Sequence, residues 1–335
     1  MGRVGDPGAG GAAAGGSDPI FQGAERTAAT PRRATLLFQF FLFPLLIVVA
    51  SVGVFLLFGA IGGADRSPAE HLDTIQTGGD NAQKQAVHQL AAALLDERRK
   101  VDAGTLPLEK AFYAAPAFRA KLLAVFEDSF RSERTPERQE ALARCVGAVG
   151  DPASLDALTA RLVPATAVGV RRAIVQSIAM LPTDRTVGPL VTALEDPDDF
   201  VRNAAVQGLS RYRNDASVAA LHKALGDASL PVRLTAASAL GVWGDAAAKP
   251  LVAQLLDPAW VDANLVQAST GGDPGAAGPA LRAASRQAAL ANGLRAAAGL
   301  ADPELKPRVE ALTRDGDESL RALARDVLDR WGSPR

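Results

Sequence analysis

Residues 196–209, with the sequence DPDDFVRNAAVQGL, decide the fold, because the same chemical pattern occurs twice more nearby. The stretch at 227–240 reads DASLPVRLTAASAL, and the stretch at 165–178 reads ATAVGVRRAIVQSI. A valine–arginine pair holds the same place in each stretch, and successive pairs are 31 residues apart. A period of this length predicts stacked helix pairs, because one pair alone cannot bury its apolar face.

Each repeat is predicted to contain two helices joined by an acidic turn. The first helix begins at an aspartate and carries leucines at helical spacing. Proline then stops this helix, and an aspartate caps the second one, which opens at the valine–arginine pair. A large side chain closes the end of the second helix. The predicted repeat core comprises Leu190, Leu194, Leu209, Leu221, Leu225, Leu240, Leu251, Tyr212, Trp243 and Trp331.

This pattern resembles the HEAT repeat family, which has an aspartate in the turn and a basic residue six positions later. The matching residues are Asp196, Arg202, Asp227, Arg233, Asp315, Arg321 and Arg171, the last with Ala165 in the aspartate position. The resemblance implies an all-α fold, an α-solenoid of HEAT-type helix pairs. It also implies an internal, partly buried arginine–aspartate ladder. We expect the paired charges of the ladder to satisfy each other between repeats, with Arg202 as the partner of a partly buried Asp196.

The repeat region is predicted to extend over residues 68–334. Its clearest repeats lie in 151–257, residues 68–96 form a degenerate first unit, and residues 105–130 form a helix pair rich in phenylalanine. Between 258 and 302 the pattern is irregular and loses its arginine, and residues 269–278 form a flexible loop. Cys145 occupies the apolar ridge of a further repeat, which predicts a buried thiol and no nucleophile.

A long apolar segment precedes the repeats. No charged residue occurs in 34–64, and residues 36–61 read LLFQFFLFPLLIVVASVGVFLLFGAI. As a helix these residues measure roughly 39 Å, which exceeds the ~30 Å hydrocarbon core of a bilayer. We therefore predict a single transmembrane helix in 34–64 that contacts the lipid bilayer through residues 36–61. Residues 1–33 are rich in glycine and alanine, which predicts a disordered tail.

The charges that flank the apolar segment predict its orientation. Arg26, Arg32 and Arg33 precede it, whereas mostly acidic residues follow it. The positive-inside tendency then gives a cytoplasmic N-terminus and an extracytoplasmic repeat domain. The abundance of alanine, glycine and arginine fits a bacterial genome rich in GC, and hence the bacterial inner (cytoplasmic) membrane. A cleaved leader is the alternative and would release a secreted binding domain, although the apolar run is about twice a usual signal-peptide core.

The chain shows no pattern of catalytic residues. A nucleophile elbow, a phosphate-binding loop, HExxH and CxxC are all absent from the sequence. His71, His88 and His222 do not have metal-ligand spacing. The formal net charge of −1 has no concentrated basic footprint, which argues against a nucleic-acid partner. We therefore expect no metal, no cofactor and no small-molecule substrate.

Solenoids mostly hold other molecules, which predicts a non-enzymatic scaffold. In this interpretation the membrane anchor raises the local concentration of a protein partner, which binds a concave helical surface. An enzymatic alternative comes from a second resemblance, because bacterial HEAT-like repeats are similar to those of phycobilin lyases, which attach or detach bilin chromophores. The similarity lies in the repeat scaffold, which does not by itself carry activity.

Overall fold

In the computed structural model, residues 66–131, 135–266 and 278–332 are described. The predicted tail (1–33), the predicted transmembrane helix (34–64) and nearly all of the predicted loop at 269–278 lie outside these residues. The chain divides into two units, residues 1–65 and 66–335, and the second unit contains every described residue. Among the helices of the described ranges, none combines the length and apolar character needed to cross a membrane.

The described residues form seven helix pairs and contain no strand. In chain order, the pairs are α3 (Pro68–Thr77) with α4 (Asp80–Asp102), α5 (Pro116–Arg131) with α6 (Pro136–Val149), α7 (Leu155–Thr159) with α8 (Val168–Met180), α9 (Val187–Ala193) with α10 (Asp199–Leu209), α11 (Asp215–Ala224) with α12 (Leu230–Val242), α13 (Lys249–Leu255) with α15 (Pro279–Leu300), and α16 (Lys306–Leu312) with α17 (Glu318–Gly332). The helical repeat architecture predicted from the sequence is thus confirmed.

The predicted helix pair at 105–130 is wrong. Its first half forms two short 3₁₀ turns, η2 (Leu108–Lys110) and η3 (Phe112–Ala114), and α5 pairs with α6 instead. Pro107 and Pro116 flank these turns, and each proline disfavours helical conformation in the residue before it, which favours short turns here. The ring of Phe112 then packs edge-on against that of Phe118, with centroids 5.0 Å apart.

Aspartates cap several of the helix starts, whereas Thr183 caps the turn before α9 and Asn214 caps α11. Asp151, Asp245 and Asp302 each accept the N–H two residues later, at the 3₁₀ turns η4 (Pro152–Ser154), η6 (Ala246–Ala248) and η9 (Pro303–Leu305). A similar turn, η5 (Asp184–Thr186), precedes α9. Asp198 caps α10 by accepting the N–H of Val201 (3.1 Å).

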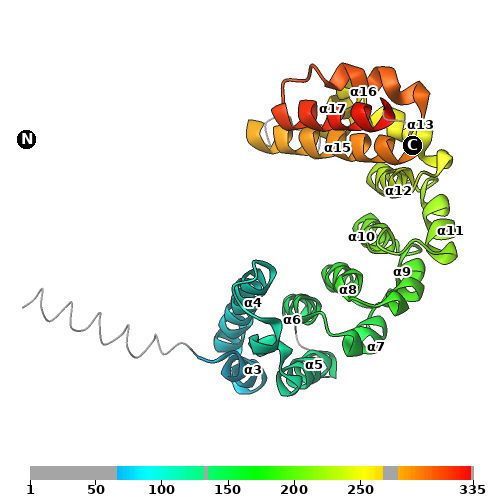
Figure 1. Ribbon diagram of the computed structural model, residues 1–335. Coiled ribbons are helices and arrows are strands. Elements are labelled where there is room, and N and C mark those ends of the chain that lie inside the picture. Colours follow the sequence, from blue (N-terminus) through cyan, green and yellow to red (C-terminus); the bar gives the residue numbers. More distant parts are fainter. Residues whose placement is uncertain (1–65, 132–134, 267–277, 333–335) are drawn as a thin grey trace, which may run out of the picture. The chain divides into compact units, whose positions relative to one another are not determined.

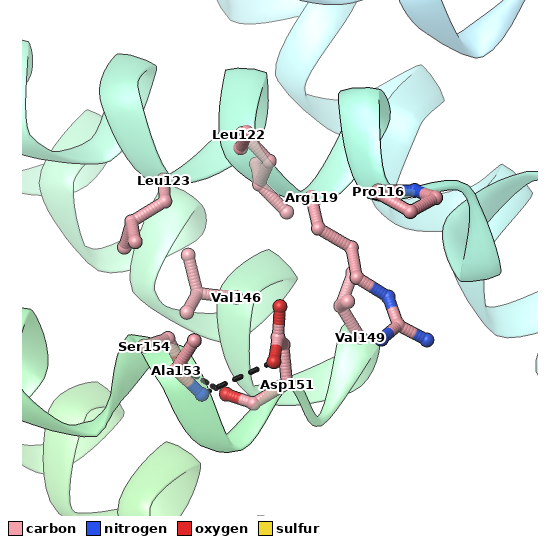
Figure 2. A pocket seen from close by; sticks show the side chains of 10 residues that line it. Pro116, Arg119, Leu122, Leu123, Val146, Val149, Asp151, Ala153 and Ser154 are labelled. Carbon is pink, nitrogen blue, oxygen red and sulfur yellow. Dashed lines mark hydrogen bonds between the residues drawn. The ribbon is translucent and has the colours of Figure 1, made fainter.

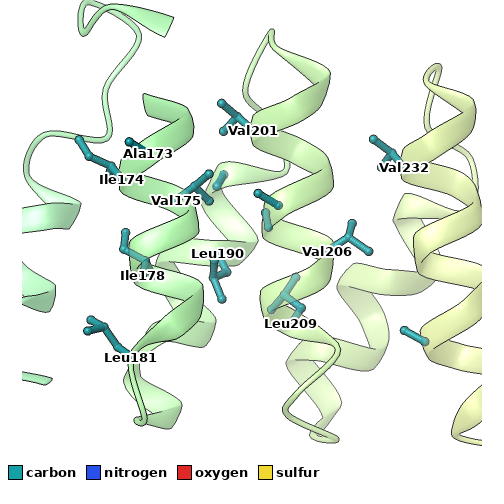
Figure 3. Packing of buried hydrophobic residues seen from close by; sticks show 14 of the residues in the cluster. Ala173, Ile174, Val175, Ile178, Leu181, Leu190, Val201, Val206, Leu209 and Val232 are labelled. Atoms are coloured by element: carbon teal, nitrogen blue, oxygen red, sulfur yellow. The ribbon is translucent and has the colours of Figure 1, made fainter. Parts of the chain in front are cut away.

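The second helices pack on one another in one row, called here the inner row: α4, α6, α8, α10, α12, α15 and α17. In Figure 1 this row lies on the inner side of the stacked pairs, and the first helices lie outside it. Figure 3 shows how α8, α10 and α12 bury the core between them. Val175 and Val206 hold the same position in successive repeats, and both are completely buried.

The predicted core residues divide into two groups. Leu190, Leu209, Leu221 and Leu240 are completely buried. The others are half-buried at the edges of the core and pack against it: Leu194, Leu225, Leu251, Tyr212, Trp243 and Trp331. Tyr212 also donates its hydroxyl to the carbonyl of Leu181 in the preceding repeat (3.1 Å), which ties the end of one helix to the next repeat.

The irregular stretch contains a regular inner helix. The short helix α14 (Pro258–Val261) and the π-helical turn η7 (Asp262–Val266) follow α13, and α15 then packs on α12 as the next member of the inner row. The contact is close because Gly299 faces α12. A Cβ atom at Gly299 would lie 2.3 Å from the carbonyl oxygen of Gly241.

Candidate interaction surface

The arginine–aspartate ladder joins each repeat to the one that follows it. Arg171 holds Asp196 with two bonds, Nε to Oδ2 (2.8 Å) and Nη2 to Oδ1 (3.0 Å). Arg202 holds Asp227 in the same way, at 2.8 and 2.9 Å. Both pairs are largely shielded from water, and such bidentate pairs are strong and orienting.

The pairing of Arg202 with the side chain of Asp196 is therefore wrong. Within one repeat, Nη1 of Arg202 donates to the main-chain carbonyl of Asp196 (2.9 Å), and Arg233 bonds to the carbonyl of Asp227 (2.7 Å). The carboxylate of Asp196 points back to the preceding repeat because its Oδ1 also accepts the N–H of Asp198 (2.9 Å). This turn bond fixes the direction of the ladder.

A ladder arginine is also present in the irregular stretch. Arg286 of α15 donates to Asp315 from Nη2 (2.7 Å) and Nη1 (3.3 Å), and Nη1 of Arg321 bonds to the carbonyl of Asp315 (2.8 Å). The expectation that the repeat loses its arginine here is wrong. The sequence spacing hides Arg286, because it stands 29 residues before its partner where Arg171 and Arg202 stand 25 residues before theirs.

The ladder arginines lower the pKa of two of its carboxylates, those of Asp227 and Asp315. The guanidinium of Arg202 is the main cause that lowers the pKa of Asp227 below its ordinary value, although burial opposes this shift. Arg286 lowers the pKa of Asp315 in the same way. Arg233 donates to the main-chain carbonyls of Asp227 and Ala228, and no salt bridge joins it to a carboxylate of the described residues. The ladder is thus interrupted after Arg233.

A second clamp lies beside the ladder on the inner row. Arg172 donates two bonds to Asp198 (2.9 and 2.6 Å), and its guanidinium carbon lies 4.5 Å from the ring centroid of Phe200. Phe200 itself is 64% exposed. The arginine therefore fixes the orientation of a large apolar side chain that faces solvent.

Two adjoining cavities form a groove along the inner row, called here the inner groove. The first, of about 490 Å³, lies over α12 and is lined by Gln207, Ser238 and Val242, among others. The second, of about 450 Å³, lies between α15 and α17 and includes Arg295. Asn292 lines both cavities. The groove thus combines apolar surface with neutral groups that form hydrogen bonds.

A smaller cavity of about 280 Å³ lies between α5, α6 and the turn after α6 (Figure 2). Its wall is mostly apolar and includes Leu122 and Val146. The two charged residues of its lining already have main-chain partners, because Asp151 accepts the N–H of Ala153 and Arg119 donates to a carbonyl. This cavity accommodates a side chain and shows no arrangement for catalysis.

The titratable residues noted in the sequence lie apart from one another. Cys145 is 1% exposed, and burial raises the pKa of its thiol to about 12, so it is not a reactive thiolate. His71 is buried in α3, His88 is exposed, and His222 contacts Asp245 (2.6 Å). Within the described ranges, no group of three His, Cys, Asp or Glu side chains is placed to hold a metal ion.

Several solved structures are similar to this chain. The Escherichia coli protein YibA has 15% identity, coverage of 82% of this chain and 96% of that chain, and a TM-score of 0.48. Human deoxyhypusine hydroxylase, solved with glycerol, has 17% identity, coverage of 82% and 98%, and a TM-score of 0.29. A designed armadillo repeat protein in complex with the peptide (KR)4 has 16% identity, coverage of 80% and 100%, and a TM-score of 0.32.

The comparison with sequence families agrees with the repeat geometry. No curated protein matches the chain. The family model of HEAT repeats matches residues 120–210, 161–229 and 187–269, which overlap and cover the region of α6 to α13. The ladder pairs Arg171–Asp196 and Arg202–Asp227 lie inside these matches. The chain therefore contains a HEAT-repeat domain.

Proposed function

We propose that the HEAT-repeat domain is a non-enzymatic scaffold that holds a protein partner against its inner row. The observation that carries this proposal is the placement of exposed apolar side chains. Of the eight large ones in the described residues, six lie on inner helices and two lie on connections. The six are Leu95, Val168, Met180, Phe200, Val242 and Leu281. Large apolar side chains exposed along one row of helices favour a binding surface on that row.

Phe200 has the properties of a residue that dominates the binding energy of an interface. It is large and exposed, and the Arg172–Asp198 pair holds its ring before any partner arrives. A side chain that is already ordered loses little conformational entropy on binding. Residues of this kind contribute about 2 kcal/mol or more at the centre of an interface.

Site-specific photocrosslinking in cells tests this proposal. A photoreactive amino acid is placed at Gln207 on α10, or at Thr192 on α9 as the matched outer control, since both side chains are exposed. We expect a discrete crosslinked protein from Gln207 only, and we expect Phe200→Ala to reduce it strongly. Equal crosslinking from both positions, or none from Gln207, contradicts an inner binding surface.

We further propose that residues 36–61 anchor this scaffold in a bacterial inner membrane with the repeat domain outside the cytoplasm. The supporting observations are the long run without charge and the arginines that precede it. Protease treatment of intact spheroplasts that carry a C-terminal tag tests the orientation. Loss of the tag supports an extracytoplasmic domain, whereas survival until lysis reverses the orientation.

The two alternatives predict different behaviour of the full chain. A secreted binding domain would appear as a shortened soluble protein, whereas an anchored scaffold stays in the membrane pellet after an alkaline wash. A phycobilin-lyase-like enzyme would bind a bilin or change its absorbance. Absorbance spectra of the purified chain mixed with a bilin therefore test the enzyme directly, and an unchanged spectrum favours the scaffold.

A further inference from the structure

The inner helices α8, α10, α12 and α15 carry a marked excess of positive charge. Together they contain seven arginines and a single carboxylate, that of Asp199 at the first position of α10. Four of the arginines form salt bridges with carboxylates from other segments: Arg171, Arg172, Arg202 and Arg286. The carboxylates of these repeats lie mainly in turns and first helices, so the charged side chains of these four helices are mainly cationic.

Two exposed arginines on this face have no salt bridge with a described residue. Arg295 of α15 donates Nη1 to the side-chain oxygen of Asn292 (3.0 Å). Arg211, just after α10, donates Nη1 to the carbonyl of Ala179 (2.6 Å). Each guanidinium has further N–H groups, and the oxygen that it contacts belongs to a neutral group in each case. These arginines are therefore available to an anion.

Arg295 lines the second cavity of the inner groove, and Arg211 directly follows Ser210, which lines the first. Arg211 and Arg295 each stand nine residues after the ladder arginine of their repeat, and Val242 holds the same position on α12 between them. Val242 is 51% exposed and lines the groove with Gln207, Ser238 and Asn292. The order along the row is thus cation, apolar side chain, cation, with neutral hydrogen-bonding groups beside them.

The spacing of the helices limits the length of a bound segment that can contact Arg211, Val242 and Arg295 together. Neighbouring packed helices lie about 8–10 Å apart, so α10 and α15, with α12 between them, lie about 16–20 Å apart. An extended chain rises about 3.3 Å per residue, so about six residues span this distance. The side chain halfway along such a segment then lies over Val242.

We propose that the inner groove binds an extended segment of a partner protein with two acidic side chains about six residues apart and a large apolar side chain between them. The proposal rests on the scaffold function proposed above and adds the chemistry of the partner. The carboxylates bind Arg211 and Arg295, whose planar guanidinium groups favour two-point contact with a carboxylate. The apolar side chain covers Val242.

Short labelled peptides test this chemistry with the full chain in mild detergent. The probe is a nine-residue fluorescent peptide of serine and glycine with aspartate at positions 2 and 8 and leucine at position 5. Three matched probes carry asparagine or lysine in place of both aspartates, or aspartates at positions 4 and 6. By fluorescence anisotropy we expect the first probe to bind about tenfold tighter than each of the others, consistent with two exposed ion pairs.

Substitutions in the protein test whether the tighter binding of the aspartate probe depends on the arginines beside the groove. Arg211→Gln and Arg295→Gln should each weaken binding of the aspartate probe about fivefold and leave the asparagine probe unchanged, whereas the lysine variants should retain most of the affinity. Arg185→Gln is the matched control, because Arg185 is an exposed arginine outside the inner row. Unchanged melting temperatures exclude misfolding as the cause.

Three results overturn the proposal: equal binding of aspartate and asparagine probes, equal loss for both probes in the variants, or no binding of any probe. Tighter binding of a short single-stranded oligonucleotide that displaces the aspartate probe also overturns it, in favour of a general polyanion surface. The scaffold function is tested separately. A protein crosslinked from Gln207 supports that function even if the peptides show no preference for aspartate.

Discussion

At the scale of single residues, the direction in which an aspartate carboxylate points decides which arginine of the ladder it binds. Asp196 is six residues before Arg202 and 25 residues after Arg171, and its carboxylate pairs with the more distant arginine. Arg202, the nearer arginine, donates to the main-chain carbonyl of Asp196 instead. The sequence pattern predicts which residues take part, but only the turn bond from Asp198 to Asp196 decides which repeat each carboxylate faces.

Arg202 and Arg233 offer a matched comparison of this pairing. Both donate Nη1 to the carbonyls of the preceding turn, but only Arg202 also holds a partly buried carboxylate. Arg202→Ala leaves Asp227 without its charged partner, so we expect a loss of about 2–4 kcal/mol in the free energy of unfolding. Arg233→Ala should cost clearly less. Urea unfolding of both variants measures the difference, and equal losses contradict the role of the carboxylate.

His71 makes the first helix pair sensitive to mild acid. It is 7% exposed, and burial is the main cause that lowers its pKa below the ordinary 6.5, with Arg66 as a second cause. Since the folded state binds this proton less readily than the unfolded state, stability is full above pH 6.5 and falls as the pH drops below it.

We expect His71→Leu to remove this component of the pH dependence. Thermal melting of the parent chain, His71→Leu and the exposed control His88→Gln between pH 5 and 8 measures it. The control should follow the parent. A His71→Leu variant that loses stability as steeply as the parent below pH 6.5 would assign the acid sensitivity to other groups.

At the scale of helices, close packing depends on residues that have no side chain. Gly299 places α15 against the backbone of α12, where a Cβ atom would meet the carbonyl oxygens of Gly241 and Val242 at 2.3 and 2.5 Å. The helices must separate to admit a methyl group, so Gly299→Ala should cost about 1–3 kcal/mol of folding free energy.

Gly188 of α9 is the matched control for this substitution. A Cβ atom there would meet no other atom within 4 Å, so Gly188→Ala should be neutral or stabilising by ~0.5–1 kcal/mol through helix propensity. Calorimetry of both variants separates the two effects. Equal stability of Gly299→Ala and the parent would show that α15 moves away from α12 without loss.

At this scale, some repeats can be predicted from the sequence and others cannot. The repeats around Arg171, Arg202 and Arg233 are visible because their spacing is constant. The repeat of α15 is not visible, because α14 and η7 lie between its two helices and shift its ladder arginine out of register. The inner groove could not be predicted from the sequence either, because Gln207, Val242 and Asn292 come from three helices and lie together only when these helices pack.

At the scale of the whole repeat domain, the last repeat differs from the internal ones. Four residues after each ladder arginine, the internal repeats carry Val175, Val206, Ala237 and Leu290, which are all completely buried. The last repeat carries the exposed Arg325 at this position. The exposed arginine makes the outer face of this repeat polar, which disfavours association through that face.

Replacing Arg325 should expose this end to association. Arg325→Leu extends the apolar surface formed by the half-buried Leu328 and Trp331, and we expect a mass increase toward the dimer in light scattering at high protein concentration. Arg314→Leu, an exposed arginine in the preceding turn, is the control. A strictly monomeric Arg325→Leu protein would show that α17 caps the domain by other means.

The one-way ladder also bears on how such a chain changes its length. Since Arg171 and Arg202 each bind the aspartate carboxylate of the next repeat, excising residues 197–227 would bring Arg171 and Arg233 into consecutive repeats with Asp196 still between them. A duplication of the same 31 residues would likewise supply one new ladder arginine, a copy of Arg202, and one new ladder aspartate, a copy of Asp227. Recombination by whole units therefore conserves the pairing, whereas a pairing confined to each repeat would leave neighbouring units with no polar link between them.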